Sequence, residues 1–148
     1  MTFEMRLTQE IALGAVTDLD GALRDFLGRI GYLRGEEDTE ESVAYRLAKD
    51  CFIVGSGWTW SVDEMLVFLS TSRPTLYRHL NRLKSLNLIE EVSLGPERGN
   101  ARKGYRLRYG NLSKAWDFAE ADAAITLNAY RENIDHIQKL VDARTGMA

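Results

Sequence analysis

Hydrophobic residues recur every three or four positions in the first part of the chain, which is the spacing of one face of an α-helix. The repeat extends from Leu7 to Leu33 and includes Val16, Leu19, Leu23, Phe26, Ile30 and Leu33. Glycines interrupt it, and each costs up to about 1 kcal/mol relative to alanine inside a helix. We therefore expect either two shorter helices or one helix held by close packing. After an acidic connector at 35–41, a second helix is predicted at 40–54, where two glycines end it.

Two short helices with a tight turn between them are predicted in the middle of the chain. Ser61 and Glu64 have the spacing of a capping box, in which each side chain accepts a hydrogen bond from the other residue's backbone N–H. Residues 70–72 make the turn, and Ser72 caps the next helix, whose first turn accommodates Pro74. This second helix extends to about Leu86. Its predicted buried stripe consists of Leu76, Leu80 and Leu83.

A β-hairpin and a long helix follow. Residues 88–94 and 104–109 are predicted as strands, with a polar loop rich in turn residues at 95–102. Either Asn111 or Ser113 then caps a helix that extends to about Arg144. The whole pattern predicts a mainly α protein with a small β-hairpin. Its three parts are an N-terminal helical segment at 1–35, a central unit at 40–110 and a long C-terminal helix at 111–146.

The charge distribution changes the expected partner. The chain has a net charge of -3, which by itself disfavours nucleic acid. Residues 71–109, however, contain nine basic and three acidic residues, a net charge of +6, which leaves -9 for the remainder. A basic segment on an acidic protein is typical of a local phosphate-binding surface, although chance clustering on a solvated face gives the same count.

This order of elements is typical of a winged helix-turn-helix: a short helix, a three-residue turn, a second helix and a basic hairpin. In that fold the second helix enters the major groove of DNA. Arginine can donate two hydrogen bonds to guanine, and asparagine can pair with adenine. Serine, threonine and lysine suit phosphate contacts. The predicted DNA-binding residues are Ser72, Arg73, Thr75, Tyr77, Arg78, Asn81, Arg82 and Lys84, with Arg98, Arg102 and Lys103 in the hairpin, or wing.

The run from Leu66 to Ile89 resembles the core of winged-helix bacterial regulators of the MarR superfamily, particularly its GbsR-like relatives. Residues 78–83 match the recognition helix and residues 86–89 match the exit into the wing. Asn87 stands where the pattern usually has glycine, and asparagine also tolerates the left-handed conformation. The resemblance implies a homodimer on a pseudo-palindromic site of double-stranded DNA. It also implies dimerisation through the N- and C-terminal helices and a small-molecule effector pocket between dimer and wing.

The C-terminal helix supports a dimer independently of that resemblance. Its residues Ala123, Leu127, Tyr130, Ile134, Ile137 and Val141 follow the 4-3-4-3-4 spacing of a coiled-coil seam. The seam can pack on the first helix of the same chain or on a second chain, and we expect a bundle of both helices from both protomers. The predicted dimerisation residues are Leu19, Leu23, Ile30, Leu127, Tyr130, Ile134, Ile137 and Val141.

Other functional classes have little support. We find no Ser/His/Asp set, paired carboxylates or phosphate-binding glycine loop, so we expect no enzyme, cofactor or metal. The histidines, His79 and His136, are expected in packing or on the surface. Cys51 is expected in the core rather than as a redox sensor. The tryptophans are expected in the core or, alternatively, around an effector pocket. No apolar run approaches ~20 residues, and the N-terminus lacks a signal-peptide pattern, so we expect a cytoplasmic protein.

The resulting expectation is a sequence-specific DNA-binding transcriptional regulator. The alternatives are a winged helix used as a protein-interaction module in a transcription or segregation assembly, and a DNA-binding protein of replication or partition. If DNA is the partner, Arg73, Arg78 and Arg82 should be exposed on the same face as Arg98 and Arg102. An apolar patch there would favour the interaction module.

Overall fold

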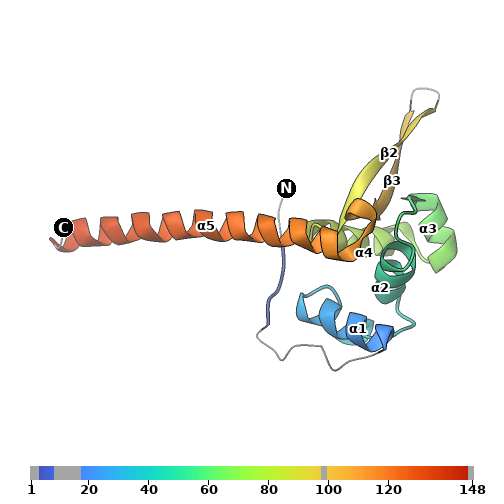
Figure 1. Cartoon of the computed structure of the whole chain (residues 1–148), viewed down its shortest axis with the longest axis horizontal. Coiled ribbons are helices and arrows are strands. Elements are labelled where there is room, and N and C mark those ends of the chain that lie inside the picture. Colours follow the sequence, from blue (N-terminus) through green and yellow to red (C-terminus); the bar gives the residue numbers. More distant parts are fainter. Residues whose placement is uncertain (1–3, 9–17, 98–99, 147–148) are drawn as a thin grey trace.

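The computed structural model describes residues 4–8, 18–97 and 100–146, with the side chains of 95–102 left aside. It is mostly helical with one small three-stranded antiparallel sheet (Figure 1). A body of short helices carries the β-hairpin on one side. The C-terminal helix begins on this body and projects far beyond it (Figure 1).

The first helix, α1 (Leu19–Arg29), is shorter than the sequence predicts. Asp18 caps it by accepting a hydrogen bond of 2.9 Å from the Gly21 N–H, and Gly31, at φ +91°, turns the chain away after its end. Residues 4–8 are not helical, because the N–H groups of Glu4 and Arg6 donate to carbonyls of distant segments. The predicted helical start at Leu7 is therefore wrong, and residues 9–17 lie outside the described residues.

The second predicted helix is confirmed, although its interior is not uniform. It begins as α2 (Val43–Arg46), where the Ser42 hydroxyl accepts from the Tyr45 N–H. It continues as a π-helix over Leu47–Ile53, with Leu47, Ala48, Cys51 and Phe52 buried. Cys51 lies in the core, as its position on the apolar face of this helix predicts.

The central helix pair has the boundaries that its capping residues predict. In α3 (Val62–Leu69), Ser61 and Glu64 form the capping box with hydrogen bonds of 3.0 and 3.1 Å. In α4 (Arg73–Ser85), the Ser72 hydroxyl caps the first turn. The stripe of Leu76, Leu80 and Leu83 is buried in a core that also contains Leu23 and Leu27 of α1.

The sheet differs from the predicted hairpin in two ways. The strands β2 (Ile89–Glu97) and β3 (Asn100–Leu107) extend into the segment predicted as a loop. A third strand, β1 (Trp60–Ser61), pairs with β3, so that the order is β1-β3-β2. The sequence does not predict β1, because its two residues are too few to show the alternating pattern of a strand. Ser61 lies opposite Gly104, where a Cβ atom would come within 2.6 Å of the Thr59 side chain.

The last helix, α5 (Leu112–Thr145), is capped by Asn111, whose side-chain oxygen accepts from the Lys114 N–H at 3.0 Å. Its base packs on the body through Ala115 and Ala119, both fully buried. Two predicted dimerisation residues, Leu23 and Ile30, are only 5% exposed and belong to the core of this chain. That prediction is corrected for them, because a side chain buried within its own chain offers no surface to a partner.

Candidate nucleic-acid interface

The solvent-facing side of α4 is polar along its length. Arg73, Tyr77, Arg78 and Asn81 are exposed, as is the capping residue Ser72, while Thr75 is half-buried. Tyr77, at 38%, is the one large hydrophobic residue of this helix that is exposed. The opposite side carries the buried leucines, so packing against the body determines which face of α4 meets solvent. The predicted polar face is therefore confirmed for these residues.

Arg78 and Asn81 differ from the other polar residues of this face. Within the described part of the chain, neither side chain has a hydrogen-bond or ion-pair partner. They are one turn apart, at i and i+3, which places them side by side on the helix surface. A guanidinium and an amide in this arrangement offer donors and an acceptor that nothing in the described residues occupies.

Arg73 stands at the start of α4 and forms an exposed ion pair with Asp63 of α3, with 2.7 Å between Nη2 and Oδ1. The pair borders a polar cleft of about 290 Å³ whose other walls include Tyr77, Lys103 and Tyr105. Exposed ion pairs contribute only about 0–1 kcal/mol. A phosphate oxygen in this cleft could therefore replace the Asp63 carboxylate at little cost.

Lys84 and Lys103 share one carboxylate on the hairpin. Lys84 Nζ lies 2.6 Å from Glu91 Oε1, and Lys103 Nζ lies 3.9 Å from Glu91 Oε2. The hydrogen bond from Lys84 holds the pKa of Glu91 below its usual range. Both lysines border the polar face, but Glu91 neutralises part of the positive charge that the sequence places there.

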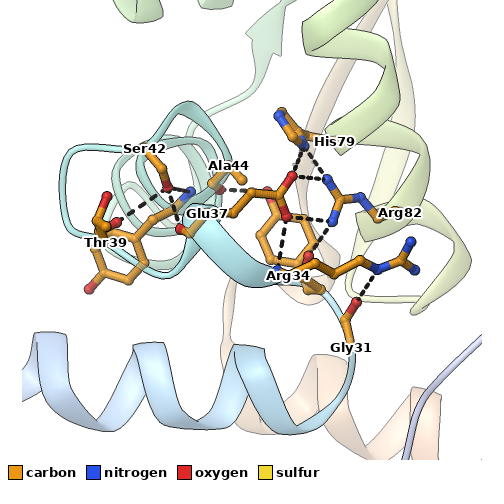
Figure 2. Close-up of polar contacts among 10 residues, drawn as sticks. Gly31, Arg34, Glu37, Thr39, Ser42, Ala44, His79 and Arg82 are labelled. Carbon is orange, nitrogen blue, oxygen red and sulfur yellow. Dashed lines mark hydrogen bonds and ion pairs between the residues drawn. The ribbon is translucent and has the colours of Figure 1, made fainter.

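Arg82 is not on the exposed face, and the prediction that it is exposed is wrong. Its side chain is only 14% exposed. Figure 2 shows its guanidinium directed into the body, where Nη1 and Nη2 donate to the two Glu37 carboxylate oxygens at 2.9 and 2.7 Å. Nη1 also donates to the Tyr32 carbonyl. Arg82 thus joins α4 to the segment between α1 and α2, a partner 45 residues away.

His79 completes this cluster, which we call the Glu37–His79–Arg82 cluster. Its Nδ1 lies 2.5 Å from Arg82 Nη2 (Figure 2). Arginine can only donate, so Nδ1 accepts and the ring is neutral with its proton on Nε2. Burial, assisted by the Arg82 charge, lowers the pKa of His79 from 6.5 to about 4. The ring is therefore a buried packing residue, one of the two roles that the sequence allows.

Acid is expected to destabilise the fold through His79. Its pKa is lower in the folded chain than in the unfolded chain, so protonation favours unfolding. The stabilisation is complete above pH 6.5 and is lost as the pH falls through about 4. Between pH 7 and pH 5 the unfolding free energy should fall by up to about 2 kcal/mol.

Urea unfolding at the two pH values measures this loss. His79→Gln, which keeps an acceptor for Arg82, should show a smaller difference between pH 7 and pH 5. The matched control is His136→Gln, which changes an exposed histidine on α5 and should retain the wild-type difference. An equal pH dependence in all three proteins would assign the acid sensitivity to other groups.

The basic segment carries less free charge than its composition indicates. Arg106 and Arg108 approach Glu90 at 2.8 and 3.6 Å, in addition to the pairs that neutralise Arg73, Arg82 and Lys84. Arg98 and the side chain of Arg102 lie outside the described residues, so their predicted place beside α4 stays a prediction. The acidic partners Asp63, Glu37 and Glu91 have no motif that would reveal them in the sequence.

Other residues considered from the sequence have ordinary surroundings. Cys51 is fully buried, and burial raises the pKa of its thiol to about 12. Trp58 is exposed, while Trp60 stacks at a tilt on Phe68, with ring centroids 5.3 Å apart. Trp116 packs edge-on against Phe26 and borders an apolar groove of about 580 Å³ between α1 and α5. No described residue of β2 or β3 lines this groove, so the expected effector pocket between dimer and wing stays a prediction.

None of the helices in the described ranges is both long and apolar enough to span a lipid bilayer. Comparisons with protein-family models, curated proteins and solved structures found no match to this chain.

Proposed function

We propose that this protein is a sequence-specific DNA-binding transcriptional regulator with a winged helix-turn-helix fold. The element order supports the fold assignment: α2 is followed by β1, then by the α3–α4 pair, and then by the β2–β3 hairpin. β1 pairs with β3 and extends the hairpin to a three-stranded sheet. In this assignment α4 is the recognition helix and β2–β3 is the wing. The likeness to the MarR superfamily is part of this proposal, as is a cytoplasmic location.

The observation that carries the proposal is the pairing pattern of the basic residues. Arg82 is bound internally and Lys84 is largely neutralised, whereas Arg78 and Asn81 point to solvent with no polar partner among the described residues. These are also the residue types that pair with guanine and adenine in the major groove. Arg73 and Lys103, at the cleft beside them, suit phosphates that fix the helix in the groove.

A homodimer is the form in which such a surface reads DNA with high specificity. One recognition helix covers a few base pairs, and two related by a twofold axis read half-sites about one turn apart. In α5, the seam residues Leu127, Tyr130, Ile134 and Ile137 are all more than half exposed. A row of exposed apolar side chains of this length is unfavourable in water for a single chain. A second copy of α5 supplies a matching seam that would cover it.

A second candidate function, a protein-interaction module, is favoured by a different surface. Val67 and Phe68 of α3 are 80% and 42% exposed, and the Phe68 ring lies against Trp60. This apolar patch lies on α3 and not on the polar face of α4. Variants of the two surfaces therefore separate the two functions. Replication or partition proteins would use the same DNA chemistry and differ only in which sites are bound.

Arg78→Ala is expected to weaken binding to the specific site by about 1–3 kcal/mol, because it removes a base contact. Binding sites are first selected from random-sequence DNA, and affinities for the selected site and for random DNA are then measured by fluorescence anisotropy. The loss should be confined to the selected site. Thermal stability should hardly change, because Arg78 has no polar partner among the described residues to lose.

Arg144→Ala, which removes an exposed arginine near the far end of α5, is the matched control and should bind both DNAs as the wild type does. Equal losses on selected and random DNA would make Arg78 a phosphate contact. A wild-type protein that enriches no sequence would contradict the proposed function, and loss of a protein partner on Val67→Ser would then favour the interaction module.

A further inference from the structure

Asn87 ends the last turn after α4 in the left-handed conformation, at φ +61°. Glycine would satisfy this backbone equally well, but Asn87 also has a buried side chain, only 6% exposed. Its Nδ2 donates to Oδ2 of Asp122, 35 residues later, at 2.7 Å. The asparagine therefore does more than tolerate the turn: it connects the exit of α4 directly to the base of α5.

Arg108, the first residue after β3, reinforces the same connection. Its Nε donates to the Asn87 carbonyl at 3.0 Å, and its guanidinium lies 4.0 Å from the centre of the Phe118 ring on α5. Such cation–π contacts contribute about 0.5–2 kcal/mol. Tyr109, at φ +60°, also contacts Phe118, with 6.4 Å between the two ring centroids. One arginine thus contacts both α5 and the exit of α4.

Beyond Asp122, α5 leaves the body. Within the described residues, none of the interactions found for residues 123–145 reaches the helical body, and the helix projects freely (Figure 1). At 1.5 Å per residue, this part is about 35 Å long. A rotation of 10° at its base therefore moves the far end by about 6 Å, which is close to two base-pair steps of DNA.

We infer that Asn87, Arg108 and Asp122 form a joint that fixes the direction of α5 relative to the recognition helix α4, and that this joint sets the half-site spacing the dimer accepts. They are positioning residues, since none of them needs to touch DNA. The inference rests on the proposed function, because the spacing has meaning only for a dimer that joins through α5. The joint itself is a property of one chain and can be measured without DNA.

The first experiment measures the joint by pulsed electron paramagnetic resonance on the full-length protein. The distance between spin labels at Val67→Cys on α3 and Lys139→Cys on α5 reports the direction of α5. Excess unlabelled protein ensures that few dimers contain two labelled chains, so that the measured distances lie within one chain. Both sites are exposed, whereas the natural Cys51 is fully buried and does not compete for the label. Asn87→Gly preserves the left-handed turn, and Asp122→Ala removes the same hydrogen bond from the other side.

Each variant should shift or broaden the distance distribution by several ångströms, a change of the size that a 10° rotation produces. Glu120→Ala, which removes an exposed carboxylate two residues away on the same helix, is the control and should leave the distribution as in the wild type. Unchanged distributions in both joint variants would overturn the inference.

The second experiment measures binding to selected sites whose half-sites are moved by one or two base pairs. The wild-type protein should prefer one spacing, and Asn87→Gly should reduce that preference about tenfold, or about 1.4 kcal/mol, while the dimer mass stays unchanged. An undiminished preference would overturn the inference even if the distances change. Failure of the proposed function gives a different result, because the wild-type protein would then bind no site at any half-site spacing. That result would also overturn the role of the joint in setting the spacing.

Discussion

Replacing Leu127 and Ile134 together by glutamate is expected to convert the proposed dimer into a monomer. Both side chains are more than half exposed on α5 in the single chain and are one heptad apart on the predicted seam. In a dimer they would be buried, and an unpaired carboxylate there costs several kcal/mol. The dimer dissociation constant should rise at least about a thousandfold, which corresponds to about 4 kcal/mol.

The substitutions should leave the fold of each chain intact. Neither residue belongs to the core, and glutamate is a good helix former. Sedimentation should therefore give twice the 16.8 kDa chain mass for the wild type and the single mass for the variant. The helical circular dichroism of the variant should be retained.

Ala129→Glu with His136→Glu is the matched control. These exposed residues have the same seven-residue separation but lie on the other side of α5, so this variant should remain dimeric. DNA binding tests the link to function: the Leu127/Ile134 variant should lose tight binding because each half-site is then held alone. A wild-type monomer that still binds its site tightly would contradict both the dimer and the pseudo-palindromic site.

Arg82→Ala is expected to reduce the unfolding free energy by about 2–4 kcal/mol, because it leaves a partly buried carboxylate without its partner. Glu37 loses both guanidinium contacts, His79 loses the donor at Nδ1, and the Tyr32 carbonyl loses another. Small domains are stable by only about 5–15 kcal/mol, so this loss should appear as a large decrease in the urea midpoint. Glu37→Gln should cause a loss of the same order.

Arg78→Ala is the matched control on the same helix, one turn earlier, and should change stability by no more than about 0.5 kcal/mol. The two arginines should thus separate: Arg82 determines stability and Arg78 determines DNA affinity. If the Arg82→Ala variant instead keeps the wild-type stability but binds DNA more weakly, the Arg82 guanidinium contacts DNA, as the sequence pattern predicts.

The sequence by itself determined the elements whose boundaries depend on neighbouring residues. The starts of α3 and α4 are defined by hydrogen bonds that span three residues, between Ser61 and Glu64 and from the Thr75 N–H to the Ser72 hydroxyl. The leucine stripe of α4 and the Asn111 cap of α5 are equally local. Asn87 also takes the left-handed turn that its residue type predicts. Such signals are legible because both partners lie within one helical turn of each other.

Only the tertiary structure decided what depends on residues far apart. The Arg82–Glu37 pair spans 45 residues, and the Asn87–Asp122 hydrogen bond spans 35. β1 exists only because β3 pairs with it, and Leu23 and Ile30 are core residues only because other elements cover them. A count of charges or of apolar spacings treats every side chain as free, whereas packing selects which basic residues are neutralised and leaves Arg78 and Asn81 unpaired within the described residues.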